Sequence, residues 1–142
     1  VEKNIDEYLN LRLDGTKYVV GDGPQLRSLK KRFPGVRFAG AQQGEELASY
    51  YAAADVLVFP SRTDTFGLVI LESLASGVPV AAHRVTGPLD AIGNAGVGVL
   101  DEDLARAATQ AMSISPDRCR FHAQKFSWNS VSEQFLGNLC AA

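Results

Sequence analysis

The sequence predicts an α/β fold: a doubly wound, Rossmann-like parallel sheet with helices on both faces, in three layers. Short apolar segments alternate with amphipathic segments along the 142 residues, which is the order of strands and helices in such folds. The apolar segments lack polar residues at every second position, as expected for parallel strands covered on both faces. The length suits one compact domain, in which 46% hydrophobic residues can form a core.

The expected elements follow one another from the N-terminus. An amphipathic helix in 1–10 precedes the first strand, which runs through 16–20 into the turn Gly-Asp-Gly-Pro. Further short, apolar strands are expected at 36–40, 55–60, 78–82 and 96–100. Helices with suitable boundary residues are expected at 25–33, 44–54, 67–76, 101–112, 115–126 and 127–139.

Composition and charge argue against several partners and locations. The formal net charge is −2, so the basic balance of a nucleic-acid-binding domain is missing. The apolar runs fall short of the ~20 residues that span a bilayer, and no signal peptide is recognised. Cys119 and Cys140 match no metal spacing; we interpret them as free thiols in a reducing, cytoplasmic compartment, with a disulfide as the alternative. Because the chain starts abruptly at Val1, we expect it to be cut from a longer protein.

In doubly wound sheets, ligands bind where strands end and loops lead into helices. The first such loop holds Gly21, Asp22 and Gly23, where small residues allow a ligand to approach the backbone. It lacks the third glycine of the dinucleotide fingerprint, so NAD binding is not expected. The second loop contains Gly40 and Ala41, whose backbone could face a nucleobase. An ordinary turn or a plain loop is the alternative for both.

The strongest signal is the segment FPSRTDTFGLVILESLASGVPVAA, residues 59–82. Its helix begins near Phe66 or Gly67, and the N–H groups of the first turn favour a phosphate there. Glu72 follows about five residues later, roughly 8 Å along the axis, where its carboxylate could accept hydrogen bonds from a ribose diol. Asp64, before the helix, could bind the hydroxyls of an attached sugar or only cap the helix.

Other polar residues near the strand ends carry weaker signals. Glu72 could instead belong to a solvated stripe, although its apolar neighbours leave little polar face. His83 and Arg84, in the expected loop 82–90, could touch a phosphate or an acceptor, but lone residues of this kind are more typical of solvent-facing loops. The basic run 29–33 is interpreted as a solvated helix face, with membrane-surface contact as the alternative. Neither a P-loop nor a nucleophile elbow is found.

On these residues the sequence resembles the family 4 glycosyltransferases, retaining enzymes with the GT-B fold. Their donor-site motif is an acid, a turn often reading Gly-Phe-Gly, and an apolar run that ends in Glu. Phe66, Gly67 and Glu72 match this motif. Asp64 stands where the family has Glu, and Thr65 stands where it often has Gly. Asp is one methylene shorter than Glu but keeps the charge and the acceptor oxygens.

The resemblance covers nearly the whole chain. Beyond the central motif it includes the glycine turn at 21–24, the loop, helix and strand in 38–61, and the closing segment 126–135. It implies the C-terminal, donor-binding domain of a two-domain enzyme whose N-terminal acceptor domain is absent from this chain. A UDP- or GDP-linked sugar would be the substrate, with no metal and no other cofactor.

The family's site roles carry over residue by residue. Glu72 would hold the ribose, and Asp64 would hold the donor sugar. Lys3 lies in "EKN", which resembles the family's lysine-containing segment, and would neutralise charge on the leaving diphosphate. The backbone groups that follow Asp64 would contact the sugar or the diphosphate. They belong to Thr65, Phe66, Gly67 and Leu68.

We therefore expect the donor half of a retaining hexosyltransferase, of mannosyl or glucosyl type, that acts on a lipid or polysaccharide and is inactive as this domain alone. The full-length enzyme could contact a membrane peripherally. A non-catalytic nucleotide-sugar-binding module fits the same loops. An epimerase or hydrolase with the GT-B fold needs a water-activating acid or base that the sequence does not reveal. A phospho-signalling domain needs an acidic Mg²⁺ site, for which Asp22 and Asp64 are insufficient.

Overall fold

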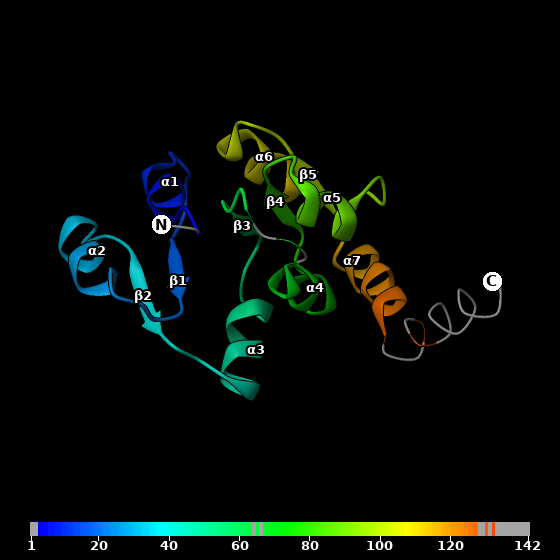
Figure 1. The fold of residues 1–142 in the computed structure, drawn as a ribbon, viewed down its shortest axis with the longest axis horizontal. Helices are drawn as coiled ribbons and strands as arrows, with labels where there is room; N and C mark the ends of the chain where they lie inside the picture. The colour runs from blue at the N-terminus through cyan, green and yellow to red at the C-terminus, as the bar shows by residue number, and fades with distance from the viewer. Residues whose placement is uncertain (1–2, 64, 66, 128–129, 131, 133–142) are drawn as a thin grey trace.

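The computed structural model describes residues 3–63, 65, 67–127, 130 and 132. Figure 1 shows how its elements are arranged. The strands are β1 (Tyr18–Val20), β2 (Arg37–Gly40), β3 (Leu57–Phe59), β4 (Val80–Ala82) and β5 (Gly98–Leu100). The helices are α1 (Ile5–Asn10), α2 (Leu26–Arg32), α3 (Gly44–Ala52), α4 (Leu68–Ala75), α5 (Thr86–Ile92), α6 (Leu104–Ala111) and α7 (Pro116–Ala123), with the 3₁₀ turn η1 (Gln124–Phe126) after α7. Strands and helices alternate, which confirms the predicted α/β class.

The strands pair in parallel throughout the part of the chain that the structure describes. β3, β4 and β5 form a three-stranded ladder in that order, and β1 pairs with β2. No ladder joins β1 to β3 among the described residues, so the strands form two hydrogen-bonded groups. In Figure 1, α1 and α2 accompany β1 and β2, α4 to α7 surround the other three strands, and α3 connects the two groups.

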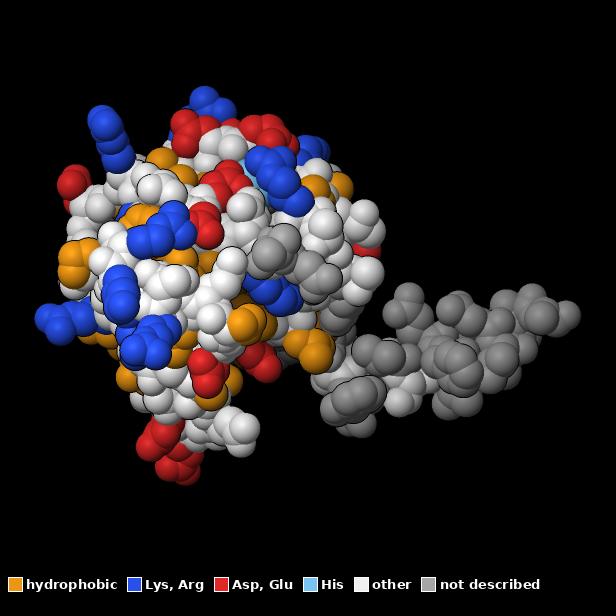
Figure 2. Space-filling model, turned by 60° about the vertical axis from the view of Figure 1, so that its left-hand side comes forward, with side chains coloured by type: hydrophobic (Ala, Val, Ile, Leu, Met, Phe, Trp, Pro, Cys, Tyr) orange, Lys and Arg blue, Asp and Glu red, His pale blue; other side chains and the backbone are white. Residues whose placement is uncertain are grey.

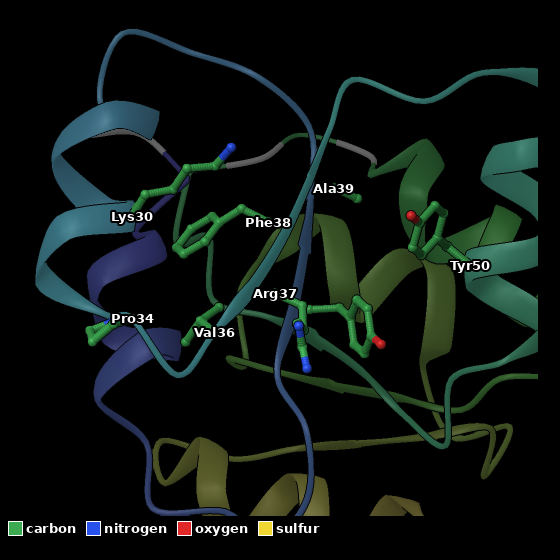
Figure 3. Close-up of a pocket in the computed structure, with 8 residues that line it drawn as sticks. Lys30, Pro34, Val36, Arg37, Phe38, Ala39 and Tyr50 are labelled. Carbon is green, nitrogen blue, oxygen red and sulfur yellow. The ribbon is translucent and has the colours of Figure 1, made fainter.

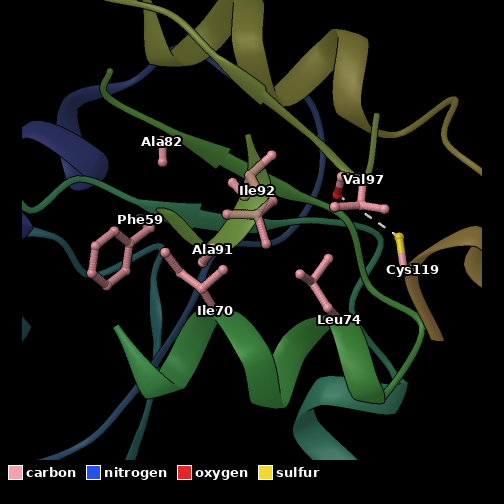
Figure 4. Close-up of a cluster of buried hydrophobic side chains, with 9 residues drawn as sticks. Phe59, Ile70, Leu74, Ala82, Ala91, Ile92, Val97 and Cys119 are labelled. Atoms are coloured by element: carbon pink, nitrogen blue, oxygen red, sulfur yellow. Dashed lines mark hydrogen bonds between the residues drawn. The ribbon is translucent and has the colours of Figure 1, made fainter. Parts of the chain in front are cut away.

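The three-stranded group carries helices on both faces because its residues alternate between sides. Val80 and Ala82 of β4 pack with Ile70 and Leu74 of α4, whereas Ala81 packs with alanines of α6. All five side chains are fully buried. Figure 4 shows Ile70 and Leu74 pointing from α4 toward the strands. This is the helix–sheet–helix layering of a doubly wound fold, and it fixes α4 against β3 and β4.

A cysteine in the middle of α7 packs into the same core. Cys119 is a free, buried thiol, and its Sγ lies 3.8 Å from the carbonyl oxygen of Val97 (Figure 4). Burial raises the pKa of this thiol above its ordinary value. The predicted free state is therefore confirmed for Cys119, while Cys140 lies outside the described residues.

The helix prediction fails at one place. The sequence predicts a loop over 82–90, yet Thr86–Ile92 form α5, with Pro88 buried in its first turn. Proline fits this position because the first N–H groups of a helix have no intrahelical acceptor. The predicted helix at 127–139 falls almost entirely outside the described residues.

None of the helices in the described ranges is long and apolar enough to cross a bilayer.

Candidate functional site

A cavity of about 910 Å³ lies between the two groups of strands. β1 and the residues after it line one side, and β3 with Pro60 and Ser61 lines another. Other walls include the N-terminal turn, the loop after β2, α3 and α4, through Lys3, Ala41, Gln42, Leu47, Tyr50, Tyr51, Val69 and Glu72. A concave, largely apolar space with a few polar groups is the usual form of a small-molecule site.

The cavity brings together predicted residues that are distant in the sequence. Lys3, Gly21, Ala41 and Glu72 all line it. Six other predicted residues are described by the structure but do not line the cavity: Asp22, Gly23, Gly40, Thr65, Gly67 and Leu68. The other two, Asp64 and Phe66, lie outside the described residues, so their roles stay predictions.

The two glycine turns at the ends of β1 and β2 are in contact. Gly21 donates its N–H to the carbonyl oxygen of Gly40 at 2.7 Å, so Gly40 borders the cavity through Gly21. Asp22 Oδ1 accepts a hydrogen bond from the N–H of Gly23 at 2.7 Å. This local bond closes the turn, which suits the alternative that Asp22 and Gly23 belong to an ordinary strand-to-helix connection.

Glu72 lies on an exposed, apolar face of α4. Ile70 and Leu74 are turned into the core, whereas Leu68 is 66% exposed and Val69 38%. Glu72 follows these two at helical spacing and is also exposed. A solvated stripe normally carries several polar side chains, and this face carries apolar ones beside a single acid. The arrangement therefore fits a surface that a ligand covers.

Tyr51 is a candidate that the sequence reasoning missed. Its hydroxyl donates a hydrogen bond to Glu72 Oε2 at 2.9 Å. Burial, this hydrogen bond and the negative charge of Glu72 raise the pKa of the Tyr51 phenol above its ordinary value, so Tyr51 stays a neutral donor. Tyr50 and Tyr51 are neighbours in the sequence, and no local pattern indicates which of them faces α4.

Gly67 allows the chain to turn into α4. Its φ of 71° is left-handed, and a Cβ there would lie 3.1 Å from Ile70 Cδ1. Glycine is therefore the residue that fits this turn without strain. Among the described residues, no side chain caps the first turn of α4. This suits the predicted use of its N–H groups for an anion.

Asn4 ties the N-terminal turn to the end of β3. Its side-chain amide donates to the carbonyl oxygen of Pro60 at 3.2 Å and also contacts Glu7. Its backbone is left-handed, with a φ of 49°, a conformation that asparagine tolerates better than most residues. This link holds Lys3 next to the segment that leads into the donor motif.

His83 requires a correction. A solvent-facing position is predicted for it, yet His83 is fully buried at the end of β4. Its Nε2 lies 3.0 Å from Glu7 Oε1, and Arg62 contacts both Glu7, at 3.7 Å, and Glu102, at 3.0 Å. Arg84 is exposed, as predicted. Through these contacts α1 meets the segments that follow β3, β4 and β5.

A second hollow, of about 460 Å³, lies outside the predicted site (Figure 3). Residues of β1, α2, the loop after α2, β2 and α3 line it: Tyr18, Lys30, Pro34, Val36, Arg37, Phe38, Ala39 and Tyr50. None of the site residues predicted from the sequence is among them. Figure 2 shows Lys and Arg side chains gathered on the side of the molecule that carries α2. The run Lys30, Lys31 and Arg32 is exposed there, in keeping with the predicted solvated face.

No cluster of three or more His, Cys, Asp or Glu side chains suited to a metal ion occurs in the described part of the chain.

Comparisons with known proteins show the family. Residues 5–114 match the family described as glycosyl transferases group 1. A GDP-mannose-dependent alpha-mannosyltransferase of Corynebacterium glutamicum is 42% identical over 136 residues, which cover 93% of this chain and 33% of that protein. The sulfoquinovosyl transferase SQD2 of Arabidopsis thaliana is 35% identical over 129 residues, which cover 80% of this chain and 25% of that protein.

Solved structures show the same fold. Anabaena HepE in complex with UDP matches with a TM-score of 0.76 and 21% identity, over 99% of this chain and 46% of that one. A sucrose-phosphate synthase from Thermosynechococcus elongatus matches with a TM-score of 0.76 and 28% identity, over 99% of this chain and 41% of that one. The chain thus spans a quarter to a third of the two curated relatives and less than half of these structures. It belongs to the group 1 glycosyl transferases, and the resemblance seen in its donor motif is confirmed.

Proposed function

We propose that this chain is the donor-binding domain of a retaining glycosyltransferase that transfers a hexose from a UDP- or GDP-linked sugar to a lipid or polysaccharide. The observation that carries the proposal is the cavity between β1 and β3, where Lys3 and Glu72 line one space. A cation and a carboxylate at one cavity suit a ligand that joins an anionic diphosphate to hydroxyl-bearing rings. The acceptor domain lies in the rest of the full-length enzyme.

The donor is oriented by groups at the start and middle of α4. Glu72 accepts hydrogen bonds from the ribose hydroxyls. The N–H groups at the start of α4, beyond Gly67, face the diphosphate, where the helix dipole favours negative charge. Asp64 binds hydroxyls of the sugar, a role that rests on the motif alone.

The reaction breaks the bond between the sugar C1 and the diphosphate oxygen and forms a bond from C1 to the oxygen of an acceptor hydroxyl on the same face, and the proton of that hydroxyl passes to the leaving diphosphate. Negative charge builds on the leaving diphosphate as the sugar takes on oxocarbenium character. Lys3 and the N–H groups of α4 stabilise that charge, a role that a metal ion fills in other enzymes. This gives a metal-independent transfer in which the protein provides electrostatic stabilisation and orientation.

Two related proteins support a nucleoside diphosphate sugar as donor. The Corynebacterium glutamicum relative is named for its dependence on GDP-mannose. The Anabaena structure with the same fold holds UDP. Both ligands contain a nucleoside diphosphate, and they differ in the base.

Isothermal titration calorimetry tests the proposal. The full-length protein is titrated with UDP, GDP and ADP in a metal-free buffer. One diphosphate should bind more tightly than the other two, and Glu72→Ala should weaken that binding by at least tenfold, because a charged acceptor is lost. Glu46→Ala, an exposed acid at the start of α3, is the matched control and should bind as the parent does. Full affinity in Glu72→Ala, or no binding of any of the three, would contradict the assignment.

A further inference from the structure

We propose that Tyr51 is a positioning residue for Glu72: its hydroxyl holds one carboxylate oxygen, so that the carboxylate is presented to the ribose hydroxyls of a nucleoside diphosphate in a fixed orientation. The inference rests on the proposed function and deepens it. It adds a residue from α3, outside the donor motif of α4, to the donor site.

The geometry places the pair where a ligand would need it. Tyr51 and Glu72 come from different helices and line the same 910 Å³ cavity. Their side chains are joined by a hydrogen bond of 2.9 Å between the Tyr51 hydroxyl and Glu72 Oε2. Tyr51 is half-buried, whereas Glu72 is exposed, so the tyrosine is the more constrained partner.

A glutamate on an exposed helix face has several rotamers to lose when it binds a ligand. The hydrogen bond from Tyr51 restricts Glu72 before the ligand arrives, which lowers the entropic cost of binding. An ionised carboxylate has about four acceptor positions, and one tyrosine hydroxyl occupies one of them. The second oxygen and a remaining lone pair are therefore left for two hydroxyls of a diol.

A tyrosine suits this task better than a cation would. Lys or Arg at this position would neutralise Glu72 and compete with the ligand for its oxygens. Tyr51 has a raised pKa and keeps its proton, so it donates without adding charge. The carboxylate thus retains its negative charge for the ribose hydroxyls.

The test compares Tyr51→Phe with the parent in the full-length protein by calorimetry, with UDP and 2′-deoxy-UDP, and with GDP and 2′-deoxy-GDP if GDP binds more tightly. Tyr51→Phe keeps the ring and removes only the hydroxyl. We expect the ribonucleotide to bind about tenfold more weakly, because a hydrogen bond to a charged group is lost from the site. The affinity for the 2′-deoxynucleotide should fall less, so the ratio of the two affinities, which measures the preference for ribose, should decrease.

Two further variants separate positioning from a general structural effect. Ser28→Ala removes a hydroxyl from α2, outside the cavity lining, where it donates to the carbonyl oxygen of Gln25, and should keep the parent's ribose preference. In a Glu72→Ala background, Tyr51→Phe should cost little further affinity, because the two residues act through one contact. Thermal melting of each variant checks that the fold is intact.

The outcomes distinguish this inference from the proposed function. If Glu72→Ala weakens binding while Tyr51→Phe does not, the role of Tyr51 is wrong and the donor site stands. If Tyr51→Phe weakens ribo- and deoxynucleotides equally, the tyrosine is structural and the inference is overturned. If no nucleoside diphosphate binds, both proposals fail together.

Discussion

Asn4 and Pro60 are joined by a hydrogen bond of 3.2 Å between the side-chain amide of Asn4 and the carbonyl oxygen of Pro60. This contact connects the turn that carries Lys3 with the strand end that leads to the donor motif. Asn4→Gly keeps the left-handed backbone and deletes the contact. We expect the affinity for the preferred nucleoside diphosphate to fall several-fold, because Lys3 is held less firmly, and calorimetry would measure it.

The control for this variant is Asn10→Ala at the other end of α1, which removes a hydrogen bond to the carbonyl oxygen of Asp6, between two residues that do not line the cavity. Its nucleotide affinity should stay at the parent's value. Equal affinity in Asn4→Gly and the parent would show that the contact with Pro60 does not position Lys3.

Gly67→Ala should affect both stability and binding. The left-handed backbone disfavours alanine by about 1–2 kcal/mol, and the new Cβ would press on Ile70 at 3.1 Å. The start of α4 must shift to relieve this contact, which moves the N–H groups proposed to meet the diphosphate. Urea unfolding and nucleotide titration of the same variant would detect the two effects. Gly35→Ala is a suitable reference, since nothing lies within 4 Å of the added Cβ.

Gly98→Ala should be strongly destabilising without any direct role in binding. An added Cβ would lie 2.5 Å from the carbonyl oxygen of Val80 on the neighbouring strand and 3.0 Å from Ile92. The contact with Val80 is to backbone, so the β4–β5 ladder must distort, at a cost of about 1–3 kcal/mol. Chemical denaturation would show a lower midpoint, and an unchanged midpoint would argue against the close approach of these strands.

The decrease of the free energy of unfolding at low pH should depend on Asp101. Its carboxylate accepts from the N–H of Asp103 at 2.9 Å and pairs with Arg106 at 2.7 Å, and these contacts hold the pKa of Asp101 below its ordinary value. A carboxyl with a lowered folded-state pKa stabilises the fold above its unfolded pKa of about 3.9, and this contribution is lost as pH falls through the folded value. Asp101→Asn should therefore be less stable than the parent at pH 7 and approach it at low pH.

Urea midpoints recorded between pH 7 and pH 3 would compare the two proteins. A constant difference across this range would mean that Asp101 acts through its shape and not through its charge. Asp90→Asn, an exposed position on α5, provides the comparison for a surface acid without these contacts.

Local patterns were sufficient to predict the alternation of strands and helices and the position of α4. Gly77 directly follows the predicted helix 67–76 and ends α4, with its N–H bonded to the carbonyl oxygen of Leu74 and a φ of 86°. Glu72 was recognised because a lone acid in an apolar helix is unusual at the level of sequence. These are features that depend on neighbours within one or two turns.

Features that depend on distant neighbours were missed. Tyr51 meets Glu72 only because α3 and α4 line one cavity, and the sequence around Tyr51 does not encode that contact. His83 resembles a loop residue until β3, β5 and α1 are placed around it. The separation of β1 from β3 is likewise a tertiary property, because both strands have the apolar composition of buried parallel strands.

The division of the strands into two ladders has a thermodynamic consequence. β1 with β2 and β3 with its partners meet across the cavity without shared backbone hydrogen bonds in the described residues. A molecule bound in the cavity contacts both groups of strands at once and so stabilises their relative position. By linkage, such a molecule stabilises the folded chain in proportion to the logarithm of its concentration. Amide hydrogens of β1 and β3 should then exchange more slowly when the cavity is filled, which makes occupancy visible far from the reacting sugar.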